Sequence, residues 1–146
     1  MRVLPARCLL AIAAVTDVAL HARTTPVAAK ALAARHGLMP RHLETLLQDL
    51  VHADILKAFR GPRGGYELAR ERRRITVGEI VRAASKPNGA AKPKPRPKLV
   101  TQVIEPALAG AGALLLDELD RITVDTLCRR AEAQAEATPG GIDFTI

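Results

Sequence analysis

Hydrophobic residues in the first fifty positions recur at intervals of three and four, the spacing of helices that bury one face. A first helix is predicted over residues 5–22, because proline is tolerated in a first turn. A second is predicted over residues 27–35, ending at Gly37, which can adopt left-handed backbone. The leucine spacing of residues 40–53 predicts a third helix.

The second and third helices, with the glycine-containing turn between them, form a predicted helix-turn-helix. Thr25 is a candidate N-cap for the second helix and Pro26 suits its first position. The third helix carries polar residues away from its leucine face: Arg41, His42, Glu44, Thr45, Gln48 and Asp49. Taken alone, such a stripe is as consistent with a solvated helix face as with a surface that reads a major groove.

An arginine- and glycine-rich segment follows the third helix. Residues 60–66 read Arg-Gly-Pro-Arg-Gly-Gly-Tyr, and the short β-type runs 55–59 and 66–68 flank them. Glycine takes positive φ at little steric cost and proline fixes its own φ, so a hairpin is predicted with Arg60 and Arg63 at its tip. A cationic hairpin after a helix-turn-helix is typical of the wing of a DNA-binding domain.

The residues after the hairpin predict the end of one domain and a linker. Ile75 is expected to close the hairpin sheet, and Thr76 with Glu79 forms a capping box for a short helix. Residues 86–98 then read KPNGAAKPKPRPK, in which four of thirteen residues are proline and five are basic. Such a composition predicts an extended linker rather than packed structure.

A long apolar helix is predicted from Leu99 onward. Its apolar face is larger than the rest of this small domain can cover, so a partner chain is the simplest way to bury it. The face contains the expected dimer contacts Ile104, Leu108, Ala111, Leu115, Leu119 and Ile122. The predicted organisation is a DNA-binding domain (1–85), a basic linker (86–98), a dimerisation helix (99–130) and a tail (131–146).

Composition and charge favour a basic, mainly helical protein. Hydrophobic residues make up 48% of the 146 positions and aromatic residues 2%, which suits aliphatic helix packing better than a β-sandwich. The net charge of +7 favours nucleic acid as a partner, with a membrane surface second. No segment reaches about 20 uninterrupted apolar residues, and Thr16 and Asp17 interrupt the N-terminal apolar run. A soluble, cytoplasmic protein is expected.

Several of these segments together resemble the Rrf-two family of bacterial winged-helix transcription regulators, the IscR/NsrR type. The strongest likeness lies in RGPRGGYELA at residues 60–69 and ITVGEIVRA at residues 75–83. Weaker likeness extends to the helix-turn-helix at residues 32–37 and 43–47 and to residues 119–127. The resemblance implies a mainly α fold with a small β-hairpin: a winged helix-turn-helix domain plus a long C-terminal dimerisation helix.

The resemblance also implies a function and a set of DNA contacts. It implies a homodimer, a repressor rather than an enzyme, on a pseudo-palindromic double-stranded operator. The implied contacts are Arg41, His42, Glu44, Thr45 and Gln48 on the recognition helix, and Arg60, Arg63, Gly64, Gly65 and Tyr66 in the wing. For Tyr66, a role in the hairpin core alone is equally consistent. A winged-helix module that binds an acidic protein or RNA is the alternative function.

The chain differs from the family in the segment where family members hold the group that senses a signal. Family sensors hold an iron–sulfur cluster on three cysteines before the dimerisation helix, whereas residues 86–98 contain no cysteine, so no cofactor is expected. Cys8 and Cys128 are the remaining redox candidates, although buried, inert cysteines are commoner. The four histidines show no metal-ligand spacing, and no catalytic constellation is present. His42 and Asp54 replace the family's usual Tyr and Gly.

Overall fold

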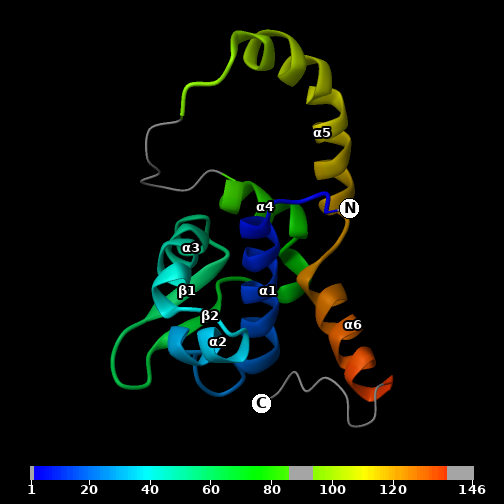
Figure 1. Ribbon diagram of the computed structural model, residues 1–146. Coiled ribbons are helices and arrows are strands. Elements are labelled where there is room, and N and C mark those ends of the chain that lie inside the picture. Colours follow the sequence, from blue (N-terminus) through cyan, green and yellow to red (C-terminus); the bar gives the residue numbers. More distant parts are fainter. Residues whose placement is uncertain (1, 86–93, 138–146) are drawn as a thin grey trace.

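The computed structural model describes residues 2–85 and 94–137, which form a helical body with one β-hairpin and one projecting helix (Figure 1). Its elements in chain order are α1 Ala6–His21, α2 Ala29–Arg35, α3 Pro40–His52, β1 Leu56–Phe59, β2 Gly65–Leu68, the 3-10 turn η1 Arg72–Arg74, α4 Val77–Ser85, the π-helical turn η2 Val100–Ile104, α5 Glu105–Leu119 and α6 Val124–Ala137. The mainly α architecture with a small hairpin is therefore confirmed.

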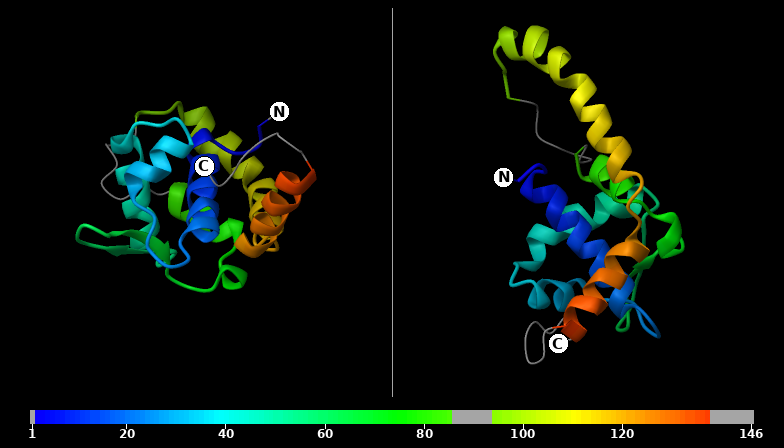
Figure 2. Two further views of the ribbon diagram at one scale, coloured as in Figure 1. Left: turned by 90° about the horizontal axis from the view of Figure 1, so that it is seen from below. Right: turned by 90° about the vertical axis from the view of Figure 1, so that its right-hand side faces the viewer.

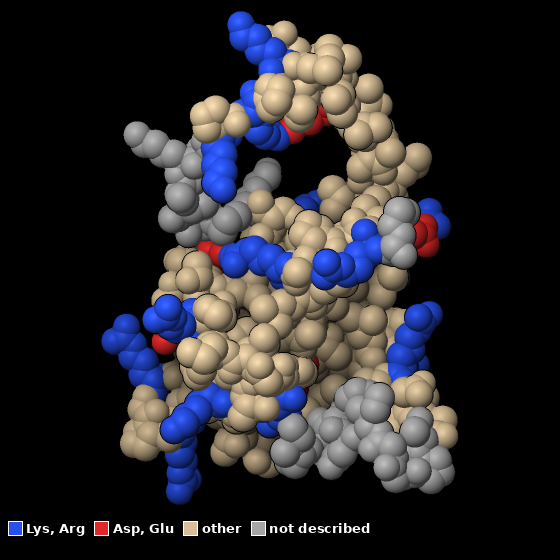
Figure 3. All heavy atoms as spheres, viewed as in Figure 1, with Lys and Arg blue, Asp and Glu red and all other residues tan. Residues whose placement is uncertain are grey.

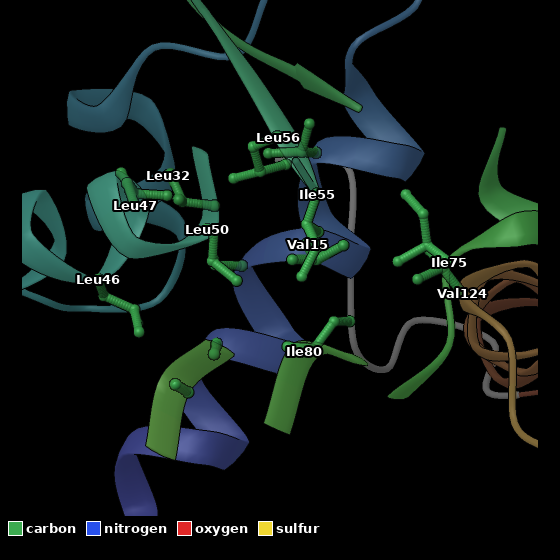
Figure 4. Close-up of a cluster of buried hydrophobic side chains, with 14 of the residues drawn as sticks. Val15, Leu32, Leu46, Leu47, Leu50, Ile55, Leu56, Ile75, Ile80 and Val124 are labelled. Atoms are coloured by element: carbon green, nitrogen blue, oxygen red, sulfur yellow. The ribbon is translucent and has the colours of Figure 1, made fainter. Parts of the chain in front are cut away.

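The core of the body is aliphatic, as the composition predicts. Leucine, isoleucine and valine from α1, α2, α3, β1, α4 and α6 meet at its centre (Figure 4). The largest side chains that are under 2% exposed are Leu32, Leu43, Leu46, Leu47, Leu50, Ile55, Leu56, Ile75, Ile80, Val15, Val18 and Val124. Helix α1 runs through the middle of this arrangement and contacts α2, α3, α4 and α6.

Helices α2 and α3 form the predicted helix-turn-helix, and Gly37 between them adopts a φ of +63°. The start of α2 differs from the prediction. Neither Thr25 nor Pro26 begins the helix, which starts at Ala29 instead. Backbone pairing of Val27 with Tyr66 is the reason, because it holds the residues before α2 in an extended conformation beside the hairpin.

The hairpin is a two-stranded antiparallel sheet in which Leu56 pairs with Leu68 and Phe59 with Gly65. Asp54 leads into it with a φ of +62°, so aspartate does adopt the left-handed conformation expected at this turn. The prediction that Ile75 closes the sheet is wrong. Ile75 is fully buried outside the sheet, and its carbonyl accepts a hydrogen bond of 2.9 Å from the N–H of Val124.

The segments that begin α4 and α6 are near-copies of each other and pair with each other. Residues 74–77 and 121–124 both read Arg-Ile-Thr-Val, and Thr76 forms an antiparallel bridge with Thr123. Each threonine caps a helix: its side-chain oxygen accepts the N–H of Glu79 or Thr126 at 3.2 Å. Glu79 also accepts the N–H of Thr76, which confirms the predicted capping box.

The C-terminal helical region is two helices rather than one. Helix α5 ends at Leu119, and α6 begins at Val124 and continues through Ala137, so residues 131–137 are helical rather than part of a tail. Residues 138–146 and the linker residues 86–93 lie outside the described residues. Helix α5 projects beyond the body, whereas α6 returns to pack against α1 (Figures 1 and 2).

No residue of α5 is buried, although much of the helix is apolar. Leu108 is 61% exposed and Leu114 is 72% exposed. Together with η2 it forms one 20-residue helix, Val100–Leu119, that is long and apolar enough to pass as a membrane span on those two criteria alone. An exposed apolar face of this kind is typical of a surface that meets a protein partner or a membrane.

Candidate nucleic-acid interface

The third helix presents a polar face because its leucines are taken by the core. Leu43, Leu46, Leu47 and Leu50 are at most 1% exposed and anchor α3 against the body. The opposite side of the helix carries the predicted base-reading residues, all of them exposed: Arg41, His42, Glu44, Thr45 and Gln48. The structure therefore places all five on one accessible side of a firmly seated helix.

A buried ion pair fixes the orientation of α3. Asp49, which was expected on the polar stripe, is only 4% exposed, and a guanidinium N–H of Arg7 on α1 donates to its carboxylate. Arg7 Nε also donates to the carbonyl of Ala84 at 3.0 Å, which joins α1, α3 and α4. The prediction for Asp49 is wrong because a charged residue can be buried when an arginine neutralises it.

A second buried carboxylate fixes α2. Asp17 on α1 is 4% exposed and accepts two hydrogen bonds from Arg35, from Nε at 2.9 Å and from Nη2 at 2.7 Å. His36 Nε2 lies 2.9 Å from the same carboxylate. The hydrogen bond to Asp17 raises the pKa of Arg35, since it stabilises the charged guanidinium. Both helices of the helix-turn-helix are thus held to α1 by charge-assisted hydrogen bonds.

Glycine is required at the base of the wing by close backbone approach. Gly65 has a φ of +155°, and a Cβ at this position would lie 2.4 Å from the carbonyl oxygen of Val27. A Cβ on Gly64 would lie 2.3 Å from the carbonyl oxygen of Phe59. Gly64 and Gly65 therefore serve the backbone of the hairpin, which makes their contribution to DNA contact indirect.

The tip of the wing is cationic and accessible. Arg60 and Arg63 are exposed, and no ion pair between described residues involves either of them. Lys and Arg side chains gather over this hairpin in Figure 3, where acidic side chains are sparse. Unpaired guanidinium groups on an exposed tip are available to phosphate or to a groove with strong negative potential.

Tyr66 anchors the base of the wing. Its ring is half-buried and packs against the core, while its backbone N–H and carbonyl both pair with Val27, at 2.8 and 2.9 Å. Burial raises the pKa of the Tyr66 hydroxyl, and the negative charge of Glu44 raises it further. Tyr66 therefore joins the base of the wing to the core and to the segment before α2.

The predicted dimer contacts divide into two groups. Ile104, Leu108 and Ala111 are exposed and Leu115 is half-buried, whereas Leu119 and Ile122 pack partly against the body's own core. The end of α5 is tied to α4, because Arg82 donates to Asp120 at 2.7 and 2.9 Å. The upper part of α5 is thus open to a partner while its lower end is fixed to the body.

Neither cysteine is placed as a reactive thiolate or as part of a cluster site. Cys8 on α1 and Cys128 on α6 are at most 1% exposed, and burial raises the pKa of the Cys128 thiol. An iron–sulfur cluster of the family type needs three or four thiolate ligands, and these two are the chain's whole supply. The donor set therefore does not fit such a cluster.

Sequence reasoning missed the residues that position the interface. Arg7 bonds to Asp49 on α3, Asp17 to Arg35 on α2, and Val27 pairs with Tyr66 at the base of the wing, so these three residues set the placement of α3, α2 and the wing. The polar interruption of an apolar helix at Asp17 was the available signal, because a carboxylate on a buried face needs a partner. Nothing in the local pattern indicates that the partner is Arg35.

Comparison with known proteins agrees with this geometry. The sequence model of the family described as "Rrf2: Iron-dependent Transcriptional regulator" matches residues 4–130. The HTH-type transcriptional regulator IscR of Vibrio atlanticus is 37% identical over 82 residues, which cover 56% of this chain and 47% of that protein. The putative HTH-type transcriptional regulator ORF2 of Azotobacter vinelandii is 36% identical over 75 residues, covering 51% and 46%. The matched segment therefore spans about half the length of these curated relatives.

Solved structures show the same fold over most of the chain. The T. potens IscR structure superposes with a TM-score of 0.69 at 32% identity, covering 92% of this chain and 91% of that one. The structure of CymR, the global cysteine regulator of B. subtilis, has a TM-score of 0.67 at 23% identity, covering 89% and 98%. The second likeness supports the fold alone.

Proposed function

Because the chain belongs to the Rrf2 family of transcriptional regulators, we propose that it is a sequence-specific, DNA-binding transcription regulator, a homodimeric repressor on a pseudo-palindromic operator. One observation carries this proposal. The polar face of α3 and the arginines of the wing tip are both exposed, α3 contacts β1 of the wing, and a buried ion pair of Arg7 with Asp49 holds α3 to the body. This arrangement suits a duplex, which offers base edges in one groove and phosphates beside it.

The two parts of this surface have different roles. The exposed residues of α3 enter the major groove, where Glu44 accepts a hydrogen bond from a cytosine amino group and so contributes to base preference. Arg60 and Arg63 of the wing flank the minor groove and contribute affinity through its negative potential. Tyr66 supports the wing from below, since its ring packs against the core.

Helix α5 brings a second copy of the chain to the operator. The apolar side chains of Ile104, Leu108, Ala111 and Leu115 pack against the same face of a second copy, which covers a helix with no buried residue. Two copies then present two recognition helices, and the operator carries two half-sites about one helical turn apart. Binding as a pair represses transcription by occluding the promoter.

Regulation in this protein does not depend on a cluster of the family type, because its two cysteines do not fit one. No group of three or more His, Cys, Asp or Glu side chains within the described residues could hold a metal ion. The function is binding rather than catalysis, in keeping with a family of regulators. A DNA partner places the protein in the cytoplasm, and α5 is assigned to a second copy rather than to a membrane.

In vitro selection from a random duplex library tests the proposal most directly. The purified full chain is expected to enrich a motif with two related half-sites, because two identical recognition helices read it. Enrichment of a single half-site would contradict the dimer. Failure to enrich any motif would contradict sequence-specific binding and favour an acidic protein or RNA as the partner of the basic surface.

A further inference from the structure

The segment directly before η2 carries three exposed cations close together. Lys94, Arg96 and Lys98 alternate with Pro95 and Pro97, and all five residues are exposed. Proline restricts φ and cannot donate a backbone hydrogen bond, so the two prolines keep residues 94–97 outside the helix, which begins at Lys98. Five consecutive exposed residues contribute little packing energy, which leaves their charge as the feature to explain.

The segment is nevertheless anchored. Arg96 forms an ion pair with Glu105 at the start of α5. The carbonyl of Pro97 accepts the N–H groups of Val100 at 3.0 Å and Thr101 at 3.2 Å, which joins the segment to η2. An anchored segment loses less conformational entropy when it binds a partner than a free one would.

The anchoring leaves two charges without a counterion. Glu105 is occupied by Arg96, and no ion pair among residues 2–85 and 94–137 involves Lys94 or Lys98. Figure 3 shows Lys and Arg side chains over the start of η2 as well as over the wing. Two exposed ammonium groups, Lys94 before the helix and Lys98 at its first turn, are suited to an external polyanion.

The position of the segment indicates which polyanion it meets. In Figure 1 the segment lies above α4 and to the left of α1, with α3 lower on the same side and the hairpin lower still, and the view from below in Figure 2 also places all three to one side of α1. A duplex that contacts α3 and the wing on that side offers a phosphate about every 3.4 Å of each strand. A second anionic partner would have to share this side with the duplex.

We propose that Lys94 and Lys98 contact backbone phosphates of the operator, as a third DNA-contacting element beside α3 and the wing. This inference rests on the proposed function and extends its footprint. The contacts carry no base information, because an ammonium group sees phosphate charge alone. They raise affinity for specific and unrelated duplexes by the same factor.

A matched pair of variants tests this inference in the full chain. Lys94→Ala/Lys98→Ala and Arg121→Ala/Arg130→Ala each remove two exposed cations, but the second pair lies at the end of α5 and on α6. Affinity for the selected operator and for a scrambled duplex is measured by fluorescence anisotropy at several salt concentrations. Removing one phosphate interaction makes the slope of log K against log salt shallower by about 0.9.

The lysine variant is expected to reduce the slope by about 1.8 per protomer and to bind both duplexes on the order of tenfold more weakly at low salt. The arginine variant is expected to keep the wild-type slope. An unchanged slope in the lysine variant, or an equal change in both variants, overturns the inference while leaving operator binding intact. Failure of the wild-type chain to bind any duplex instead overturns the proposed function, and this inference with it.

Discussion

Helices α3 and α5 are both rich in leucine, yet they bury it differently. Helix α3 seats four leucines in the core, whereas none of the residues of α5 is buried. Most helical stability in proteins comes from packing of an apolar face, and Gly110 and Gly112 lower the intrinsic stability of α5. The difference indicates that the DNA-reading body is complete within one chain, while under the proposed function α5 takes its packing partner from another.

The strongest test of this contrast is a charge in the middle of α5. Leu108→Glu places two carboxylates in the proposed dimer interface, and an unpaired buried charge costs about 3–5 kcal/mol. The dimer is expected to dissociate at micromolar concentration in sedimentation experiments while the body stays folded. Ala113→Glu is the control, because residue 113 lies about 140° round the helix from residue 108. A wild-type chain that is monomeric at these concentrations would contradict the proposed dimer.

Truncating one leucine in each helix measures the contrast within the chain. Leu50→Ala is expected to lower the free energy of unfolding by about 2–5 kcal/mol, because Leu50 is fully buried and its removal leaves a cavity. Leu114→Ala is expected to change it by no more than about 0.5 kcal/mol, because that side chain is 72% exposed. Urea denaturation of both variants measures the two changes in the free energy of unfolding. Equal losses would mean that α5 is packed as firmly as α3.

The next test concerns the wing, which is part of the folded body but carries exposed arginines at its tip. Arg63→Ala is expected to weaken operator binding by about 1–3 kcal/mol, through removal of one cation beside the minor groove. The chain should stay dimeric and keep its melting temperature. Anisotropy titration against the selected operator is the measurement, with Arg121→Ala as the control. Unchanged affinity of Arg63→Ala would remove the wing from the interface.

A variant of Glu44 separates preference for a particular base from overall affinity for duplex DNA. Glu44→Ala is expected to lose about 1 kcal/mol of discrimination at one base pair in each half-site, since the cytosine amino group loses its acceptor. Binding to scrambled duplex should stay nearly constant, because phosphate contacts are untouched. Titration against operators substituted at single positions is the readout. A loss of equal size on cognate and scrambled duplexes would assign Glu44 a structural role instead.

The smallest expected effect depends on pH and concerns the hydrogen bonds from Arg82 to Asp120, which hold the end of α5 to the body. The hydrogen bond from Arg82 holds the pKa of the exposed Asp120 below its ordinary value of 3.8. A depressed pKa means that this stabilisation is present above pH 3.8 and is lost as the pH falls through the lower folded-state value. Asp120→Asn should therefore melt slightly below the wild type near neutral pH. The two melting temperatures should converge in acid, once the pH falls below the lowered pKa of Asp120; a gap that stays constant into strong acid would exclude ionisation as the cause.

Local patterns in the sequence were sufficient for the body's elements. Leucine spacing predicted α3 and left its five exposed polar residues on the correct side, and glycine and proline marked the hairpin. The capping box at Thr76 was predicted for the same reason, since both partners lie within four residues. These features depend on neighbouring residues, and a single sequence contains that information.

Features that depend on distant residues were missed. Asp49 resembles any polar residue on α3, because its partner Arg7 is 42 positions away. The break between α5 and α6 was missed because Leu119 and Ile122 continue the helical spacing across it. The break has a physical cause in Thr123, whose hydroxyl accepts the N–H of Thr126 and so starts a new helix.

The paired Arg-Ile-Thr-Val segments have a consequence for the length of the connection between α4 and α6. The N–H of Val77 donates to the carbonyl of Ile122 and that of Val124 to Ile75, so the chain re-enters the body beside the start of the helix from which it leaves. The connection from α4 to α6 therefore begins at the end of one short helix, Val77–Ser85, and returns beside the start of that same helix. Doubling the length of a flexible connection costs only about 0.6 kcal/mol. The connection between α4 and α6 can therefore change in length at a small cost in free energy, while the body that holds α3 and the wing keeps its packing.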